Sequence, residues 1–327
     1  MILATLPGGG PDGTLVLVDR AHRRCRPVAG GPASLLAALD DWENALPRLA
    51  EAAHHLEDEP GVGAPFDPAG ALAPLPRAWT FLDGSAYLSH VERVRRARGA
   101  ALPPQLLTDP LMYQGCAAPF LPPRADVSLA DPAWGLDIEG EIGVVTGPVA
   151  AGADRATAAR AIRLLVLVND FSLRGLIPDE LAKGFGFVHG KPPSSLGPLA
   201  ITPDEAGDAW DGSKLSLPVV CTVNGLELGR PDAGRDLQFD FPALIAHAAR
   251  TRPLPAGTVV AAGTVSNRDP ARGFACLLER RMWEILAEGG ARTPFLSPGD
   301  HVRLEVEGPD ATSTFGTIAH RVVGVAP

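Results

Sequence analysis

The apolar positions of the first part of the chain predict two strands and a helix. Leu3 to Leu6 and Thr14 to Asp19 have the character of strands on either side of a turn rich in Gly and Pro. From Ser34 to Leu49, apolar residues recur at helical spacing, and Ser34 stands in the N-cap position. These three elements predict a small unit at the start of the chain.

A stretch rich in Pro and Gly, Pro60 to Pro76, follows this unit. Such a stretch is typical of a boundary, so we predict a small N-terminal domain over residues 1–75 and a larger domain over residues 76–327.

The pattern in the larger domain predicts many strands and few helices. Helical periodicity covers Asp83 to Arg98, Asp154 to Leu165, and Phe241 to Arg250. Strand patterns cover Asp137 to Thr146, Leu165 to Val168, Leu217 to Val223, Leu226 to Leu228, Thr258 to Val265, His301 to Glu307, and Thr314 to Val323. Asn224-Gly225 predicts a type I′ hairpin turn between two of them. This mixture favours an α+β fold over a doubly wound parallel sheet.

Composition excludes several classes of protein. The 327 residues are 46% hydrophobic, which argues against disorder, and 29 Lys and Arg stand against 38 Asp and Glu, a net charge of −9. An acidic chain with no basic stripe is a poor binder of nucleic acid. The most apolar run, near Leu164 to Val168, is too short to span a membrane.

The start of the chain and its cysteines indicate a cellular location. The first ten residues carry no charged segment followed by a long apolar one, so they do not resemble a signal peptide. Four scattered Cys form no C-x-x-C pair, which argues against a structural zinc and fits reduced thiols. We therefore predict a cytoplasmic protein.

The strongest chemical signal is a strand with three alternating carboxylates, Asp137, Glu139 and Glu141. Alternate residues of a strand share one face, and stacked carboxylates repel one another unless a hard divalent cation accepts their oxygens. The other interpretation of this segment alone is an acidic face exposed to solvent.

Three further segments carry candidate chemistry. Asp170 ends a buried apolar strand, where ligands often bind, although it could instead cap the turn that follows. Lys191 lies in a Gly-rich stretch that is either a flexible loop or a means of bringing an ammonium to the carboxylates. His90, on a predicted helix, is either structural or a general base.

Four segments, in their order along the chain, resemble the fumarylacetoacetate hydrolase family: the E-x-E strand at Glu139 and Glu141, the N-D-x-S-x-R motif from Asn169 to Arg174, the Lys191 loop, and Gly263-Thr264-Val-Ser266. The resemblance covers about residues 78–325, and the first 75 residues look like the small N-terminal domain of longer members. It implies a mixed β-sandwich or β-roll domain, a homodimer, and a divalent cation in the active site (Mg²⁺, Mn²⁺ or Ca²⁺). It also implies a place in aromatic amino acid catabolism.

The resemblance also assigns roles to residues. The metal ligands it implies are Glu139, Glu141, Asp170 and, as the fourth ligand of longer members, Asp83, seven residues before His90. It makes His90 the catalytic base, oriented by either Glu279 or Glu92, and it places Lys191 beside the metal. Tyr113 and Thr264, together with Lys191, match substrate contacts.

The chain also departs from the family pattern. Hydrolases of fumarylacetoacetate itself carry a Gln and a Tyr seven and eleven residues after the Asp that matches Asp170, where this chain has Ile177 and Leu181. Two polar substrate contacts are therefore missing or supplied elsewhere.

These features predict a metal-dependent hydrolase that cleaves a C–C bond in a 1,3-diketo acid of the fumarylacetoacetate or acylpyruvate type. The alternatives are a decarboxylase, hydratase or isomerase of a related 2-oxo acid, or a non-catalytic protein that binds a small molecule. The expected partner is an oxo-acid substrate, with no nucleic acid and no membrane.

Overall fold

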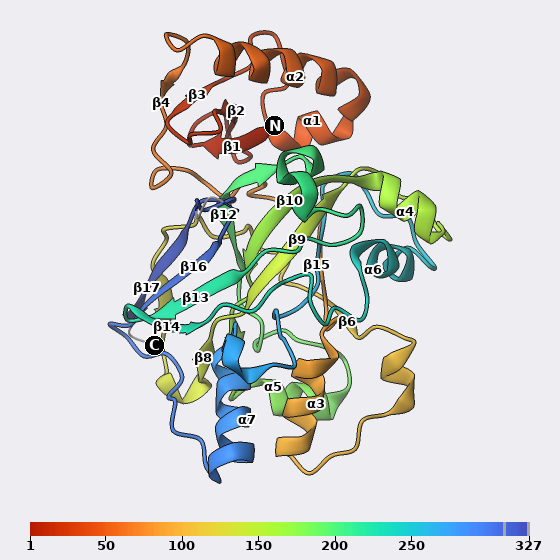
Figure 1. The fold of residues 1–327 in the computed structure, drawn as a ribbon, viewed down its shortest axis with the longest axis vertical. Helices are drawn as coiled ribbons and strands as arrows, with labels where there is room; N and C mark the ends of the chain where they lie inside the picture. The colour runs from red at the N-terminus through yellow and green to blue at the C-terminus, as the bar shows by residue number, and fades with distance from the viewer. Residues whose placement is uncertain (310–311, 326–327) are drawn as a thin grey trace.

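The largest sheet runs through the middle of the molecule (Figure 1). The computed structural model describes residues 1–309 and 312–325, and within them ten strands form this sheet in the order β4-β3-β2-β1-β12-β10-β9-β15-β5-β6. In that order, the strands are Ala64–Pro65, Arg24–Arg26, Thr14–Val18, Ile2–Leu6, Ser195–Ile201, Ile162–Asn169, Gly140–Thr146, Thr258–Ala261, Thr80–Gly84 and Met112–Gln114. Strand β15 runs parallel to β5, while the other pairs in this sheet are antiparallel.

Two smaller sheets flank it. One has the order β14-β13-β16-β17-β7, and the other pairs β11 with β8. Their strands are Leu226–Gly229, Val219–Val223, His301–Val306, Ile318–Gly324 and Val127–Leu129, then Ser172–Leu173 and Leu136–Asp137. The β13–β14 turn has positive φ at both Asn224 (51°) and Gly225 (77°), as a type I′ turn requires.

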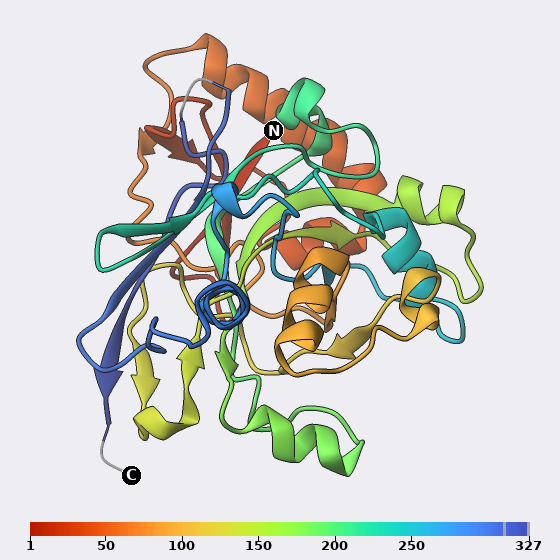
Figure 2. The ribbon, with the colours of Figure 1, turned by 60° about the horizontal axis from the view of Figure 1, so that its bottom comes forward.

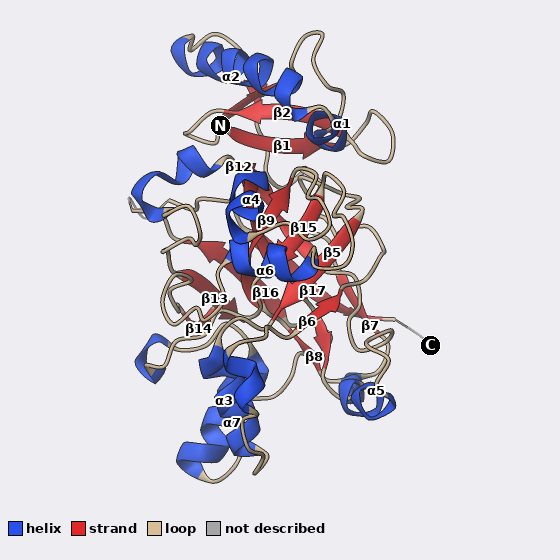
Figure 3. Cartoon of the chain, turned by 90° about the vertical axis from the view of Figure 1, so that its right-hand side faces the viewer, coloured by secondary structure: helices blue, strands red, loops and turns tan. Residues whose placement is uncertain are grey.

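The helices lie on the outside of the sheets (Figure 3). They are α1 Leu35–Asp40, α2 Trp42–Asp58, α3 Leu88–Ala97, α4 Arg155–Ala161, α5 Ile177–Lys183, α6 Phe241–Ala248 and α7 Leu277–Glu288. Short 3₁₀ turns cover Pro104–Leu107, Pro132–Trp134, Pro203–Ala209 and Pro270–Arg272. Helices α3 and α7 lie side by side at the end of the molecule farthest from α2, as Figures 1 and 2 show. Mixed sheets with peripheral helices confirm the predicted α+β class.

The N-terminal strands continue the central sheet. Strand β1 pairs antiparallel with β12, with Ile2 opposite Ile201 and Leu3 opposite Ala200. One buried cluster contains side chains from both parts of the chain, among them Leu3 and Val166. The boundary at residues 75/76 stays a prediction, but the sheet and the core extend across it.

Several predicted elements have other bounds in the structure. Strand β15 ends at Ala261 and not at Val265, and strand β17 begins at Ile318 and not at Thr314. The helix predicted over Ser34 to Leu49 is two helices, because Asp41 leaves the helical conformation (φ −131°, ψ 51°), and Ser34 does cap the first. The segment Asp83 to Arg98 begins as strand β5 and becomes helical only at Leu88. Helix α4 ends at Ala161, four residues before the predicted end, because Ile162 already pairs with Thr146.

The predicted strand Asp137 to Thr146 is interrupted. Asp137 ends β8, which pairs with β11, and the central sheet begins only at Gly140. A side chain at Gly140 would place its Cβ 2.6 Å from Cys221 Sγ, so the chain passes through the core at a residue without one. The three acidic residues of this segment therefore do not share one regular strand face.

Helices α5 and α7 were not predicted from the sequence pattern. Among the described residues, no helix combines the length and apolar character needed to cross a bilayer. The four Cys are free thiols. The cytoplasmic location and the homodimer stay predictions.

Candidate active site

Four carboxylates meet where several strands of the central sheet end. Asp83 lies at the end of β5, Asp170 follows β10, and Glu141 lies at the start of β9, with Glu139 just before it. The antiparallel pairing of β9 with β10 sets Glu141 opposite Val168, and the parallel pairing of β5 with β15 sets Asp83 opposite Ala261. The sheet register therefore brings together residues that are up to 87 positions apart in sequence.

These four side chains form a buried cluster. One carboxylate oxygen from each lies within 4.8 Å of the others. Their exposed fractions are 3% (Asp83), 5% (Glu139), 0% (Glu141) and 1% (Asp170). Three buried oxygens, Asp83 Oδ1 and both of Glu141, accept no hydrogen bond from any described residue. Buried carboxylate oxygens are normally paired, so these three indicate room for a ligand that accepts lone pairs.

The charges of the cluster support the same conclusion. Burial, followed by the charge of Asp170, raises the pKa of Asp83 well above its usual value. Burial and the charges of Asp83 and Asp170 do the same to the pKa of Glu141. Hard divalent cations take carboxylate oxygens as ligands and relieve such repulsion, so the residues present fit a divalent ion.

Glu139 is held differently from Glu141. Burial opposes its ionisation, but the charges of Arg174 and Lys191 outweigh burial and lower the pKa of Glu139. Its Oε1 accepts hydrogen bonds from Arg174 Nη2 and from Ser172 Oγ, the latter at 3.0 Å. Glu139 is therefore an ionised, oriented carboxylate beside two with suppressed ionisation.

Asp137, the first acid of the segment, lies outside this cluster. Its carboxylate accepts the backbone N–H groups of Leu277 (2.7 Å) and Leu278 (2.9 Å), at the start of α7, and pairs with Arg174 at 2.9 Å. The expectation that Asp137 points the same way as Glu139 and Glu141 is wrong, because this helix terminus captures its side chain.

Lys191 contacts the cluster directly. Its Nζ lies 2.5 Å from Asp170 Oδ2 and 3.4 Å from Glu139 Oε1. Burial alone would lower the pKa of Lys191, but these two carboxylates raise it above its usual value. Tyr113 donates its hydroxyl to Asp170 Oδ2, and Ser194 donates to Asp170 Oδ1 at 2.5 Å. Lys191 is thus a buried ammonium, and not part of a flexible loop.

His90 lies on α3 and forms a pair with Glu279 on α7. His90 Nδ1 is 3.1 Å from Glu279 Oε2, and the Glu279 side chain is completely buried. Glu92, the other candidate for orienting His90, instead pairs with Arg268 at 3.0 Å. Of the two alternatives, Glu279 is the residue in contact with His90.

The sequence assigned no role to two residues around this pair, although Ser266 belongs to one of the family motifs. Arg93 and Ser266 both donate to Glu279 Oε1, the latter at 2.6 Å. Arg93 stands three residues after His90, so both fall on one face of α3. That spacing was the available signal, but it gains meaning only once Glu279 is known to face it.

A cavity of about 330 Å³ is lined both by His90 and by two of the clustered carboxylates, Asp83 and Glu139. Its polar wall contains Asp83, His90, Glu139, Arg174, Lys191 and Thr264, and its apolar wall contains Leu111, Met112, Leu181 and Phe187. Thr264 Oγ1 is buried and has no hydrogen-bond partner among the described residues. Just before it, Gly263 has φ +86°, and a Cβ there would lie 2.3 Å from Gly84 O, so the wall needs glycine at this position.

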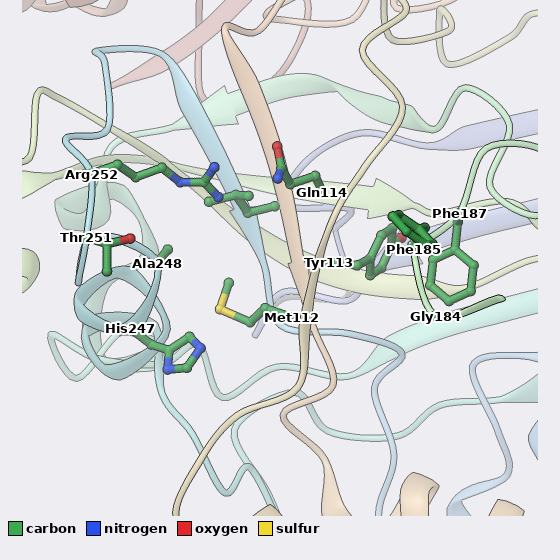
Figure 4. A pocket seen from close by; sticks show the side chains of 12 residues that line it. Met112, Tyr113, Gln114, Gly184, Phe185, Phe187, His247, Ala248, Thr251 and Arg252 are labelled. Carbon is green, nitrogen blue, oxygen red and sulfur yellow. The ribbon is translucent and has the colours of Figure 1, made fainter. Parts of the chain in front are cut away.

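A second cavity of about 590 Å³ adjoins the first, and the two share Met112, Tyr113 and Phe187 in their walls. Figure 4 shows His247, Thr251 and Arg252 on one side of strand β6, and Tyr113 with the Phe side chains on the other. The rings of Tyr113 and Phe187 meet edge to face at 5.2 Å. Met112, Tyr113 and Phe187 therefore form the part of the wall that the two cavities have in common.

Comparisons with known proteins give a consistent result. The model of the fumarylacetoacetate (FAA) hydrolase C-terminal domain matches residues 80–323, and that of the fumarylacetoacetase N-terminal domain 2 matches residues 1–77. A 2,4-didehydro-3-deoxy-L-rhamnonate hydrolase from Sphingomonas sp. (strain SKA58) is 26% identical over 212 residues, which are 64% of this chain. The aligned part spans 66% of that relative's own length.

Solved structures with the same fold include hydrolases and isomerases. Maleylpyruvate hydrolase from Sphingobium sp. SYK-6 is 17% identical with a TM-score of 0.68, over 99% of this chain and 100% of that one. A second structure of it, in complex with manganese(II) ion and pyruvate, has a TM-score of 0.65 at 18% identity, over 99% of both chains. The 2-hydroxyhepta-2,4-diene-1,7-dioate isomerase of Mycobacterium marinum has a TM-score of 0.61 at 17% identity, over 99% of this chain and 98% of that one.

The family model spans most of the chain, from strand β5 to strand β17, and includes the segments that supply the buried carboxylates, Lys191 and the His90–Glu279 pair. The chain therefore belongs to the fumarylacetoacetate hydrolase family.

Proposed function

We propose that the protein is a divalent-metal-dependent hydrolase that cleaves a C–C bond in a 1,3-diketo acid. The proposal rests on one observation: two groups of functional residues lie around the same cavity. One is a carboxylate cluster with three unpaired buried oxygens, and the other is a His–carboxylate pair. The first group suits a cation and an oxygen-rich acid, and the second suits activation of water.

Asp83, Glu139, Glu141 and Asp170 would hold the cation. When bound there, a divalent ion supplies Lewis acidity to the carboxylate and oxo oxygens of a 2-oxo acid. The manganese complex of maleylpyruvate hydrolase contains pyruvate, which is such an acid, and this supports the same kind of ligand here.

His90 would act as the general base. With Nδ1 directed at Glu279, its Nε2 is the atom left to accept a proton from water. The resulting hydroxide adds to the carbonyl carbon remote from the carboxylate, and the bond between that carbon and the CH₂ group breaks. The CH₂ carbon then takes up a proton. The products are a carboxylic acid and a 2-oxo acid, and one water is consumed.

Lys191 would stabilise negative charge on oxygen during this step. Its ammonium is buried, charged and fixed by Asp170, so little reorganisation is needed when an oxyanion develops. Thr264 Oγ1, which lacks a partner among the described residues, is available to hydrogen-bond the substrate.

The apolar wall supports an acyl group without a second charge. Leu181 lines the cavity and is one of the two residues that replace the polar pair of fumarylacetoacetate hydrolases, and Leu111 and Phe187 line the cavity with it. Such a wall gains free energy from a hydrocarbon group and disfavours an unpaired carboxylate. We therefore favour an acylpyruvate over fumarylacetoacetate.

An isomerase is the second candidate, because three of the similar structures carry the name of an isomerase. Isomerisation of a 2-oxo acid also uses a metal and a base, but it consumes no water. An oriented base serves either reaction, so the entry of solvent oxygen into a product is what distinguishes the two.

The test is a turnover assay with a set of acylpyruvates and fumarylacetoacetate, following the loss of enol absorbance. After chelation of metals, activity should be lost, and Mn²⁺ or Mg²⁺ should restore it. His90→Gln should bind Mn²⁺ as the wild type does but turn over poorly. Full turnover after rigorous metal removal, or turnover of no member of the set with either metal, would contradict the proposal.

A further inference from the structure

Arg93 forms a buried connection behind the His90–Glu279 pair. It lies one helical turn after His90 on α3, and only 13% of its side chain is exposed. Its guanidinium reaches Glu279 on the neighbouring helix α7, so His90 and Arg93 both contact one carboxylate from the same helix face.

The planar guanidinium makes four hydrogen bonds. Nη1 donates to Glu279 Oε1 and to Ser266 Oγ, the latter at 3.1 Å. Nη2 donates to the backbone oxygens of Asn267 (2.6 Å) and Arg268 (2.8 Å). A Lys ammonium is a point charge without this fork and cannot span the same set of acceptors.

The two oxygens of the Glu279 carboxylate have different partners. Oε1 is occupied by Arg93 and Ser266, so Oε2 is the oxygen that faces His90 Nδ1. Because Oε1 is fixed, the carboxylate cannot rotate away from the imidazole. A carboxylate held in this way accepts a hydrogen bond from Nδ1–H and leaves Nε2 as the basic nitrogen.

We propose that Arg93 is a positioning residue that fixes the tautomer of His90 through Glu279. The inference rests on the proposed function only in taking His90 as the base. The same guanidinium also ties down the backbone at Asn267 and Arg268, which follows the segment that carries Thr264. The Arg93 side chain thus orients the base and also fixes the backbone beside the cavity wall.

The first arm of the test needs no substrate. The nitrogen-15 chemical shifts of the His90 ring, assigned with His90→Gln, report which nitrogen carries the proton. In the metal-free wild type at a pH where His90 is neutral, Nδ1 should be protonated and Nε2 should not. In Arg93→Gln and Arg93→Lys, both tautomers should be present. Nε2 protonated in the wild type, or an unchanged tautomer in either folded variant, would overturn the proposal.

The second arm measures turnover of an acylpyruvate with Mn²⁺. Arg93→Lys and Arg93→Gln should lower kcat by roughly 10- to 100-fold, the range typical of residues that orient a functional side chain, and KM should change little. Guanidinium ion should partly restore kcat in Arg93→Ala. Arg96→Gln, an exposed Arg on the same helix, is the matched control and should keep the wild-type kcat.

The arms separate this inference from the proposed function. If no diketo acid is cleaved but the tautomer changes as described, the proposed function fails and the positioning role stands. If kcat and the tautomer of a folded Arg93→Lys match the wild type, the positioning role fails while the hydrolase activity stands.

Discussion

Glu141 combines two properties that conflict in the absence of a cation. It is completely buried, and neither of its oxygens has a hydrogen-bond partner among the described residues. Burial and neighbouring carboxylates raise its pKa well above the usual value. A bound cation that takes carboxylate oxygens as ligands therefore explains the position of Glu141. The stability of the metal-free chain explains it less well.

Glu141→Gln should abolish stabilisation by Mn²⁺. A ligand at 100 times its Kd raises the free energy of unfolding by about 2.7 kcal/mol, and this gain should vanish in the variant. The metal-free variant should be at least as stable as the wild type, because a repelled carboxylate has been removed. Thermal unfolding with and without Mn²⁺ measures both, and Glu51→Gln, on the exposed face of α2, is the control. An undiminished Mn²⁺ effect in Glu141→Gln would contradict the assignment of this ligand.

Thr264→Val should lower kcat/KM without lowering the free energy of unfolding. The hydroxyl is buried without a partner among the described residues, so its removal should leave the free energy of unfolding unchanged or slightly higher. If the hydroxyl contacts substrate, kcat/KM should fall about 10-fold, equivalent to about 1.4 kcal/mol. Denaturant unfolding and steady-state kinetics are the measurements. A clear loss of stability with normal kinetics would assign Thr264 a structural role instead.

Helix α7 shows how an element can be fixed at both ends. At its start, Asp137 accepts two backbone N–H groups, and Glu279 in the first turn reaches the site. Toward its end, Glu284 accepts the backbone N–H groups of Arg292 (2.7 Å) and Thr293 (2.9 Å), and so holds the loop that follows. The position of Glu279 therefore depends on a helix that is anchored by two buried carboxylates.

Glu284→Gln should reduce stability in a pH-dependent way. Burial opposes ionisation, but hydrogen bonds from Thr293 and Arg292 lower the pKa of Glu284 to about 2. A lowered pKa in the folded state means that the contribution is complete above the ordinary pKa of Glu and is lost as pH falls toward about 2. The variant should cost about 1–3 kcal/mol at pH 7, and the difference should shrink below about pH 4.5. A difference that is constant from pH 7 to pH 3 would contradict this.

The strands, turns and helix caps that could be predicted from the sequence are those that depend on local sequence pattern. The strands β1 and β2, the Asn224-Gly225 hairpin and the Ser34 cap follow from alternation, turn chemistry and capping. The break after Asp137 could not be predicted in the same way, because it depends on Cys221 and on the start of α7, both distant in sequence. Motif order singled out the four clustered carboxylates, while the Arg93–Glu279 contact required the packing of two helices.

The whole molecule has a core that the domain boundary does not divide. Strand β1 extends the central sheet through β12, and one buried cluster takes side chains from both sides of residue 75. The N-terminal part therefore covers apolar side chains of β9, β10 and β12 that would otherwise be exposed. This arrangement predicts that the two parts unfold together.

The chain should show one cooperative unfolding transition by calorimetry and by circular dichroism. Leu3 is completely buried on β1, so Leu3→Ala should lower the stability of that one transition by about 2–5 kcal/mol. Leu226→Ala, at an exposed site on β14, should leave it nearly unchanged and is the control. Two separable transitions, of which Leu3→Ala shifts only the first, would show that the parts are independent.

The central claim is that this cavity hydrolyses a C–C bond, and product analysis in ¹⁸O-labelled water tests it most directly. The chain is incubated with acetylpyruvate and Mn²⁺, and the acids formed are identified by mass spectrometry. Hydrolysis predicts equal amounts of pyruvate and acetate, with at least one ¹⁸O atom from solvent in each acetate. Two results would contradict this claim. Release of CO₂ would indicate a decarboxylase. A product with the mass of the substrate, after allowing for oxygen exchange with solvent, would indicate an isomerase.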